Sequence, residues 1–501
     1  MTASPAPDAP GIDLRLVPAA VTCWTVTAVG VWWGPWAALA SVLIAVAAVV
    51  GVGLRVGSVR WPAVLAVAAV GAAFAIVATV RVHAVDTHPL ASRFGTTVAV
   101  TVTPTESPRT IQGGRLMFTA SLQRLGNAES SGRVMVFAPA VGYSEVGVGR
   151  PMAFRARVTR PKRRDLSVAV LAAVGTPRFG TASTGQRAAA HVRAEFGAAA
   201  RLALPPDQAA MLPGLVLGDV SAVESDTTAA FRRAGLTHLT AVSGANVTIV
   251  CGAVLLSAAV VGPRIAVALA AVTLFAFVVI VQPSPSVLRA AAMGSVMLMG
   301  MLVHRRRQAI PALAASVLVL MVISPVLAVD AGFALSVVAT AGLVVIAPGW
   351  SRRLVNRGWP KLIADAVCVA VAAQLVTAPL VAAISGSLSL VAVAANLLVA
   401  PVIPPITILG TAAAAVAWCW PAAAQLLIRF TGPELWWLLH VARWSAAVPG
   451  AAVRVARVVE TDVRARLEAG AALPVSFDQA RHVSGGDRPG SWMALSFRLP
   501  D

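Results

Sequence analysis

The stretch LVPAAVTCWTVTAVGVWWGPWAALASVLIAVAAVVGVGL, residues 16–54, contains no Asp, Glu, Lys or Arg. A membrane-spanning helix needs about 20 apolar residues, so this stretch is long enough for two spans. Gly34 and Pro35 stand near its middle, and a Gly-Pro pair is typical of a turn. Residues 61–80 form a third uncharged stretch. We therefore expect residues 1–82 to form three transmembrane helices.

The composition of the whole chain is that of a membrane protein. Of its 501 residues, 58% are hydrophobic and 12% are charged, whereas soluble domains have about 25% charged residues. Lipid must therefore solvate most of the apolar surface. Further uncharged stretches occupy residues 239–263, 265–288, 290–303, 308–329, 331–351 and 366–428, and residues 435–449 form a last, weaker candidate span. We predict a polytopic all-α membrane bundle of about eleven transmembrane helices, with its main part at residues 239–450.

Basic residues indicate the orientation of the chain. Arg55 and Arg60 follow the second predicted span, and further basic loops contain Arg264, residues 305–307 and residues 352–361. Cytoplasmic loops carry an excess of Lys and Arg. We therefore expect these loops and the N-terminus in the cytoplasm, and the segment after the third span on the outer side of the cytoplasmic membrane.

Residues 83–180 differ in composition from the segments on either side. Short alternating runs, typical of strands, are separated there by Gly, Pro, Asn and Ser. These runs are Thr97–Val102, Leu116–Leu122, Val134–Phe137, Met152–Val158 and Val168–Val170. Five short strands suit a small β-barrel, of which the OB-fold is one type. We expect an inserted, extracytoplasmic, OB-like β domain, most of whose aromatic side chains lie in its core.

The net charge of +19 is partly concentrated in the last part of this domain and the segment that follows it. From Arg150 to Arg201 there are eleven Arg or Lys residues and two acidic ones. A polyanionic partner would explain this excess, and a solvated face or contact with anionic lipid headgroups is the alternative. Candidates for contact with a phosphate backbone are Arg155, Arg157, Arg160, Lys162, Arg163 and Arg164. In the connecting segment 181–238, residues 185–204 have the pattern of an amphipathic helix.

Polar residues cluster immediately before and inside the first span of the main bundle. Asp219, His238, Ser243 and Asn246 lead into this apolar stretch. Polar groups that enter the bilayer are costly and often functional, and a Ser-Gly pair followed by Asn can interrupt a helix beside a watery cavity. The alternative is structural, with Asp219 capping a helix and His238 lying at the membrane interface.

Four blocks of sequence resemble, in the same order, the ComEC family of competence membrane proteins. They are GLVLGD (214–219) with FRRAGLTHLTAVSGANV (231–247), PSPSVLRAAAMG (283–294), SPVLAVDAGFALSVVATAGLVVIAP (324–348) and AQLVTAPLVAAISGSLSLVAVAANLLVAP (373–401). The resemblance covers about 205–450. The motif residues that it assigns to the channel are Gly218, Asp219, Phe231, Gly235, His238, Ser243, Gly244, Asn246, Arg289, Asp330, Phe333, Ser336, Gln374, Pro379, Asn396 and Pro401.

The resemblance implies a channel that carries one DNA strand across the cytoplasmic membrane during natural transformation. The partners it implies are single-stranded DNA, the lipid bilayer, an external DNA receptor and a cytoplasmic helicase-like ATPase. A separate nuclease and a second copy of the chain are further candidates. The β domain fits the family's inserted OB-like domain. Because a DNA strand carries one charge per nucleotide, it needs a polar pathway through the bilayer.

The chain departs from the family pattern in three ways. The tail 451–501 is too short for the metallo-β-lactamase-like nuclease domain of many members, and its polar, Gly-rich composition predicts a disordered cytoplasmic segment. None of the seven histidines belongs to an H-x-H-x-D-H cluster, so we expect no metal and no cofactor. Asn246 stands where many relatives have His. No P-loop motif is present, and we expect a channel rather than an enzyme.

Two questions stay open at this point. Arg289, within a predicted span, either meets a phosphate in transit or pairs statically with Asp330, and we favour the static pair because an unpaired buried charge is expensive. A small-molecule transporter is the first alternative function. A membrane-embedded hydrolase with Ser243, His238 and Asp219 as nucleophile, base and orienting group is the second. A vestigial channel in a cell that rarely transforms is a third.

Overall fold

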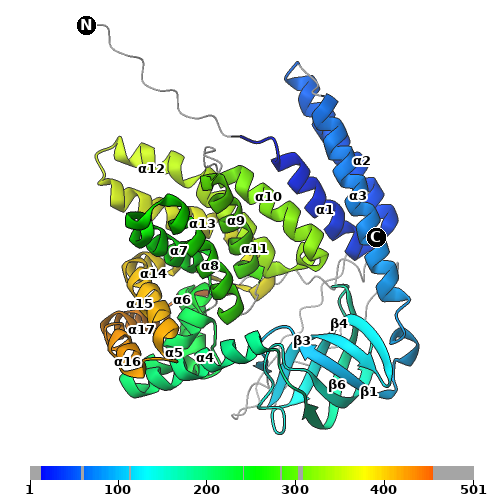
Figure 1. The fold of residues 1–501 in the computed structure, drawn as a ribbon. Coiled ribbons are helices and arrows are strands. Elements are labelled where there is room, and N and C mark those ends of the chain that lie inside the picture. Colours follow the sequence, from blue (N-terminus) through cyan, green and yellow to red (C-terminus); the bar gives the residue numbers. More distant parts are fainter. Residues whose placement is uncertain are drawn as a thin grey trace, which may run out of the picture. The chain divides into compact units, whose positions relative to one another are not determined.

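The computed structural model describes residues 13–57, 61–111, 114–240, 242–281, 285–302 and 309–454. Three helices come first (Figure 1), namely α1 (Val17–Trp33), α2 (Pro35–Arg55) and α3 (Trp61–Asp86). Gly34, with a φ of 90°, separates α1 from α2 where the Gly-Pro pair predicted a turn. The three helices meet closely at Gly30. A Cβ at Gly30 would lie 2.9 Å from the Cβ of Ala78 and 3.3 Å from that of Ala38, and such small residues let membrane helices approach each other.

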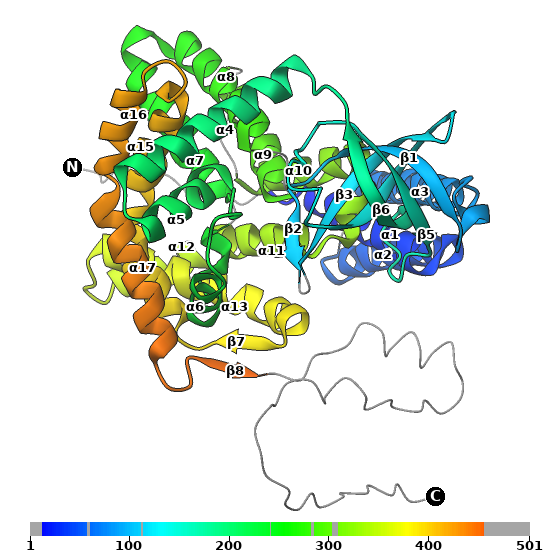
Figure 2. The same cartoon turned by 90° about the horizontal axis from the view of Figure 1, so that it is seen from below.

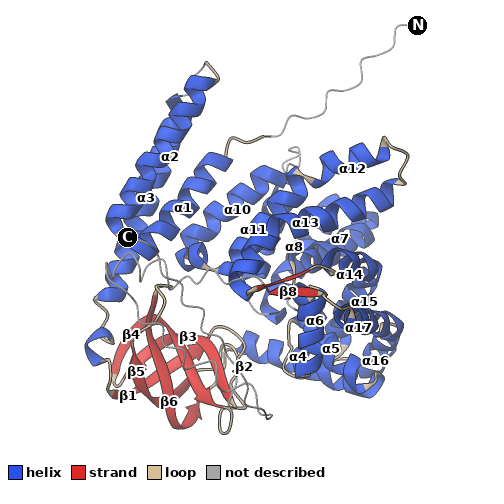
Figure 3. Ribbon diagram, turned by 180° about the vertical axis from the view of Figure 1, so that it is seen from behind, coloured by secondary structure: helices blue, strands red, loops and turns tan. Residues whose placement is uncertain are grey.

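Six strands follow α3. They are β1 (Thr97–Pro104), β2 (Arg109–Ile111), β3 (Arg115–Leu125), β4 (Ala128–Pro139), β5 (Met152–Thr159) and β6 (Ser167–Phe179). Five of them close into a small barrel in the order β1-β5-β6-β4-β3, because β3 also pairs with β1 (Figure 3). The β4–β6 pair is parallel and the other pairs are antiparallel. The five predicted strands and the barrel are confirmed. The sequence missed β2, whose three residues are too few to show a period.

Side chains along the strands alternate between the interior and the surface of the barrel. On β5, Met152, Phe154, Ala156 and Val158 are buried, and the side chains between them are more exposed, as the two-residue period of a strand requires. The barrel core also contains Phe118 and Tyr143. The prediction that most aromatic side chains of this domain are core is confirmed for Phe118, Tyr143 and Phe154.

The remaining helices form the larger part of the described chain. The segment after the barrel forms α4 (Thr184–Ala203), α5 (Pro206–Leu217), α6 (Ser225–Ala234) and the 3-10 turn η2 (Thr237–Leu239). The rest comprises α7 (Gly244–Ala258), α8 (Pro263–Val281), α9 (Pro285–Leu302), α10 (Ala309–Ile323), α11 (Ala331–Val345), α12 (Ala347–Val355), α13 (Lys361–Ser385), α14 (Ala392–Val399), α15 (Ile403–Val416), α16 (Pro421–Arg429) and α17 (Gly432–Ala447). The predicted amphipathic helix at 185–204 is confirmed as α4, which begins at the capping residue Ser183.

Within the described ranges, seven helical segments are long and apolar enough to cross a membrane, and three apolar helices are shorter. A multi-pass membrane protein is therefore supported, but the predicted number of about eleven spans is not. Residues 366–428 are long enough for three spans of about 20 residues each. They hold two candidate segments, Lys361–Ser385 and Ala392–Val416, followed by α16. The nine residues of α16 rise about 14 Å, which is less than half of a bilayer core of about 30 Å.

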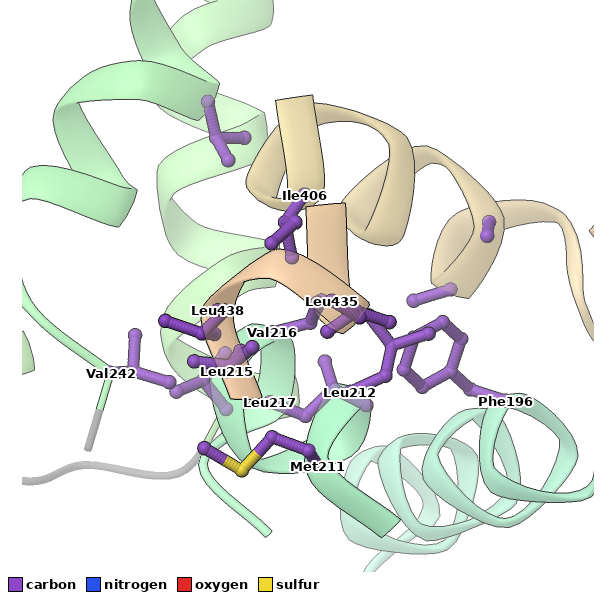
Figure 4. Packing of buried hydrophobic residues seen from close by; sticks show 14 of the residues in the cluster. Phe196, Met211, Leu212, Leu215, Val216, Leu217, Val242, Ile406, Leu435 and Leu438 are labelled. Atoms are coloured by element: carbon purple, nitrogen blue, oxygen red, sulfur yellow. The ribbon is translucent and has the colours of Figure 1, made fainter. Parts of the chain in front are cut away.

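Helix α5 lies in the middle of the largest apolar core. Leu212, Leu215 and Val216 of α5 are buried there against Phe196 of α4 and Leu435 of α17 (Figure 4). A helix that is apolar on nearly every side is stable only when other elements surround it. The burial of α5 fixes the position of its C-terminal end, from which the chain leads to α7.

A two-stranded sheet joins residues that are distant in the sequence. Strand β7 (Ser387–Ser389), which follows α13, pairs with β8 (Ala452–Arg454) in antiparallel fashion (Figure 2). We expected residues 451–501 to form a tail without regular structure. That prediction is wrong for residues 452–454, because their backbone groups bond to β7. Residues 455–501 lie outside the described residues.

Candidate functional site

The first turn of α7 is linked to the end of α5 by a buried amide side chain. Asn246, which is 7% exposed, donates a hydrogen bond from Nδ2 to the carbonyl oxygen of Leu215 at 3.0 Å. Its Oδ1 accepts a hydrogen bond from the hydroxyl of Ser243 at 3.2 Å. Ser243 occupies the N-cap position of α7, yet its side chain makes no capping hydrogen bond. The hydroxyl that would ordinarily cap the helix is therefore used to hold Asn246.

Arg289 of α9 is a buried cation with neutral partners. Its side chain is 6% exposed. Nε donates to the hydroxyl oxygen of Ser336 at 2.7 Å, and Nη1 donates to that of Thr340 at 2.8 Å and to Sδ of Met293 at 3.3 Å. Ser336 and Thr340 are one turn apart on α11, and Thr340 also donates to the carbonyl oxygen of Ser336. Two hydroxyl groups on one helix face thus fix the guanidinium group.

The expected static pair between Arg289 and Asp330 is wrong. The carboxylate of Asp330 accepts a hydrogen bond from the backbone N–H of Phe333 at 2.7 Å and caps α11. No ion pair of Arg289 is found among the described residues. The pairing prediction failed because a helix start competes for the carboxylate and the hydroxyl groups of α11 already satisfy two nitrogens of the guanidinium.

These two arrangements meet at Gly244. A Cβ placed on Gly244 would lie 3.0 Å from Nη2 of Arg289 and 3.4 Å from the Cβ of Ala290. Only a residue without a side chain lets the guanidinium come this close to the start of α7. We call this group the α7 cluster. It consists of Ser243, Gly244, Asn246, Arg289, Ser336 and Thr340.

Five members of the α7 cluster were predicted from the sequence, and Thr340 was missed. A signal for it exists, because Thr340 follows Ser336 by four residues and side chains at that spacing share one face of a helix. Leu215 was also missed, since it contributes only a backbone carbonyl. Nothing in its residue type marks that role.

Other predicted residues lie apart from the α7 cluster. Gln374 donates to the carbonyl oxygen of Ser389 at 3.3 Å, and Asn396 donates to Ala392 within its own helix turn. The remaining members of this group are structural, with Pro379 inside α13, Pro401 in the 3-10 turn Ala400–Val402, and Phe333 in the core against Trp24. The structure gives none of these residues a hydrogen bond to the α7 cluster.

The segment between α5 and α7 contains the other motif residues. Gly218 and Gly235 end α5 and α6 in the left-handed region, with φ values of 78° and 74°. Phe231 is buried in the core, and His238 is exposed in η2. Asp219 is exposed, and its carboxylate accepts a hydrogen bond from the backbone N–H of Ser221. The side chains of Ser243, His238 and Asp219 are not hydrogen-bonded to one another, so the hydrolase arrangement is not formed.

Basic residues of the barrel lie on its surface. Arg155 and Arg157 point outward from β5, between buried neighbours. The other residues predicted to contact a phosphate backbone are exposed in the loop that follows β5. They are Arg160, Lys162, Arg163 and Arg164. Two further cations of this region have structural roles. Arg150 lies over the ring of Phe179 at 4.5 Å.

Arg193 of α4 is the second of these structural cations. It donates from Nη1 to the carbonyl oxygen of Ile280 at 2.8 Å, one residue before the end of α8. Burial lowers the pKa of Arg193, and the negative charge of Asp219 acts in the opposite direction. A cation at a helix C-terminus is favourable because the last carbonyl groups carry partial negative charge. Arg193 therefore anchors the amphipathic helix α4 to α8.

A family model and a known protein both match parts of this chain. A model of the family described as "Competence protein" matches residues 215–465, which include the whole α7 cluster. The chain is 33% identical over 144 residues to ComE operon protein 3 of Bacillus subtilis (strain 168). That alignment covers 28% of this chain and 19% of the relative, so the chain spans about a fifth of that protein's length. No solved structure matches the chain.

Proposed function

Because the chain belongs to the competence protein family, we propose that it forms a channel through which a single strand of DNA crosses the cytoplasmic membrane during natural transformation. The family match supports a role in competence DNA uptake. The seven apolar helical segments among the described residues fit a protein that crosses the membrane several times. The channel itself is the further step, and it is supported by the chemistry of the α7 cluster.

The observation that carries the proposal is a buried cation next to an uncapped helix start, inside an apolar bundle. Arg289 is 6% exposed and bonds to hydroxyl groups rather than to a carboxylate. Keeping such a charge in an apolar bundle is costly, so it is usually retained for a function. A strand with a negative charge at every nucleotide needs polar donors along its path through lipid. The α7 cluster supplies such donors in the part of the chain that matches the family.

The orientation of the chain belongs to the same proposal. We place the N-terminus in the cytoplasm and the barrel on the outer side, following the distribution of basic loops. The exposed side chains of Arg155 and Arg157, together with the basic loop at 160–164, would then be available to an incoming strand. Single-stranded nucleic acids bind basic grooves mainly through their backbones.

We also propose that the chain transports and does not catalyse. Ser243 uses its hydroxyl to hold Asn246, which supports a structural role over a nucleophilic one. Without a P-loop motif in its sequence, the chain would take its driving force from a partner. We assign that role to a cytoplasmic helicase-like ATPase, with an external DNA receptor, a separate nuclease and a second copy of the chain as further partners.

An uptake experiment tests the proposal. Labelled duplex DNA is given to competent cells with the gene, without it, and with the gene restored. DNA bound at the surface and strand protected inside the cell are measured separately. The channel predicts normal surface binding, loss of the internal strand without the gene, and its return on restoration. Unchanged internal strand in cells without the gene would contradict the proposal and favour the small-molecule transporter.

A further inference from the structure

One arm of the Arg289 guanidinium has no partner among the described residues. Nε and Nη1 make hydrogen bonds to Ser336, Thr340 and Met293, but no hydrogen bond of Nη2 is found there. The residue as a whole is 6% exposed, but Nη2 is not among the fully enclosed unpartnered atoms of the described residues, so a small ligand can reach it. A buried charge without an opposite charge is costly. The described residues provide no acceptor for Nη2 of Arg289. A negatively charged acceptor would offset the charge of the guanidinium.

The start of α7 presents donors to the same place. The first N–H groups of a helix have no partners within the helix and carry partial positive charge. In α7, a helix of 15 residues, the side chain of Ser243 leaves them uncapped because it bonds to Asn246. Nη2 of Arg289 lies 3.0 Å from the position of a Cβ on Gly244, the first residue of α7. Two sets of donors therefore converge on one point. The N–H of Asn246 bonds to the carbonyl oxygen of Ser243 at 3.2 Å, whereas those of Gly244 and Ala245 have no acceptor among the described residues.

We propose that this point is a binding site for a single phosphodiester anion, held by Nη2 of Arg289 and the first backbone N–H groups of α7. Helix starts bind phosphate groups in this way, and Arg is suited to the oxygens of a phosphate. The proposal rests on the proposed function, in which the phosphodiester belongs to the DNA backbone. Fixing Arg289 through neutral hydroxyl groups leaves its full charge for the passing anion, and one cation allows release as well as capture.

Binding of short oligonucleotides to the purified full-length chain tests the site. The chain is held in a detergent without phosphate, and a fluorescent oligothymidylate is titrated by anisotropy. One oligonucleotide has phosphodiester links, and its partner has uncharged methylphosphonate links. The site predicts that Arg289→Gln weakens phosphodiester binding by about tenfold, the effect of losing one charge-assisted contact, and leaves methylphosphonate binding unchanged.

Two further variants make the result specific. Arg264→Gln removes the same charge from an exposed residue in the first turn of α8, and it should change binding less than about twofold. Gly244→Ala keeps Arg289 but places a methyl group 3.0 Å from Nη2, and it should weaken phosphodiester binding as Arg289→Gln does. Thermal unfolding checks that each variant is folded, and if Arg289→Gln does not fold, Gly244→Ala decides the matter. The site would be overturned if folded Arg289→Gln or folded Gly244→Ala bound the phosphodiester oligonucleotide as tightly as wild type.

A lipid headgroup is the other source of the same chemistry. Phosphatidylglycerol, which also carries a phosphodiester, is therefore added as a competitor. If lipid binding depends on Arg289 and oligonucleotide binding does not, the DNA assignment is overturned.

Uptake by cells distinguishes a failure of the proposed phosphodiester site from a failure of the proposed channel. Normal uptake by cells carrying Arg289→Gln, with uptake lost in cells without the gene, contradicts the site alone. Unchanged uptake without the gene contradicts the channel alone, even where Arg289-dependent binding persists.

Discussion

Asn246 donates a hydrogen bond to the carbonyl oxygen of Leu215 at 3.0 Å, across 31 residues of sequence. Leu215 lies in the last turn of α5, where carbonyl groups lack partners within the helix. The backbone N–H of Asp219, which would otherwise be its partner, bonds to Pro213 instead. One amide side chain thus satisfies a buried carbonyl and sets the start of α7 against the most buried helix of the core.

Replacing Asn246 with Ala should destabilise the membrane bundle. The carbonyl group of Leu215 would stay buried without a donor, at a cost of about 1–3 kcal/mol in the free energy of unfolding. The matched control is Asn396→Ala, because Asn396 bonds only to Ala392 in its own helix turn. Thermal unfolding in lipid nanodiscs compares the two variants. Equal melting temperatures would contradict the role given to Asn246.

Replacing Ser336 with Ala should impair uptake while the fold survives. Nε of Arg289 would lose its acceptor, and the guanidinium would no longer be held toward Gly244. We expect internal strand to fall by about tenfold and Ser336→Thr, which keeps a hydroxyl, to restore most of it. Ser316→Ala is the control, because the buried hydroxyl of Ser316 bonds to Leu313 of its own helix. Normal uptake by Ser336→Ala would show that Ser336 does not position Arg289.

Removing the charge of Arg193 should loosen α4 from α8. Its contact with the carbonyl oxygen of Ile280 is charge-assisted and partly buried, so Arg193→Gln should raise hydrogen exchange along α4. The control variant Arg201→Gln changes an exposed residue of the same helix and should leave exchange as it is. Exchange is followed by mass spectrometry on the full-length chain. Identical exchange along α4 in both variants would contradict the anchoring role.

The barrel core can be tested by titration of Tyr143, because the chain contains a single tyrosine. Burial raises the pKa of Tyr143 to about 12, whereas an unfolded tyrosine ionises near pH 10. The folded state therefore holds the proton more tightly than the unfolded state. This contribution to stability is complete below about pH 10 and is lost as the pH rises toward about 12. The absorbance of tyrosinate should appear near pH 10 only in denatured protein.

The variant Tyr143→Phe separates this effect from other titrations at high pH. The hydroxyl of Tyr143 has no hydrogen-bond partner among the described residues, so its removal should cost little stability near neutral pH. The variant should also lose part of the alkaline destabilisation of the barrel. Ionisation of Tyr143 near pH 10 in the folded protein would show that the ring is not buried in the core.

Much of the fold follows from patterns that are local in the sequence. Uncharged stretches and the Gly34-Pro35 pair predict α1 and α2, and the two-residue alternation predicts five strands of the barrel. The number of membrane spans is harder to predict from the sequence, because composition does not show where a helix ends. Residues 366–428 are uncharged throughout, but Gly386 ends α13 with a φ of 67° and the last part forms only the short helix α16. A membrane span can therefore end well inside an uncharged stretch.

The sequence predicts most residues of the α7 cluster, but it does not predict which group bonds to Arg289. Ser243, Asn246 and Arg289 stand out because they are polar in an apolar setting, and this needs only the sequence. Which group meets Arg289 depends on how α9 and α11 pack, since Asp330 and Ser336 lie on the same helix segment. Arg289 bonds to Ser336, six residues beyond the expected Asp330. Composition and periodicity do not predict contacts between helices that are distant in the sequence.

If the DNA strand passes the start of α7, photo-cross-linking from that position during uptake should capture it. A benzophenone amino acid is placed at Ala245, an exposed residue in the first turn of α7, or as a control at Phe275, which is 73% exposed on α8. Competent cells receive labelled DNA and are illuminated during uptake. Labelled strand should attach to the protein at residue 245 and not at residue 275. Uptake that proceeds normally with no attachment at residue 245 would contradict passage of the strand at the start of α7.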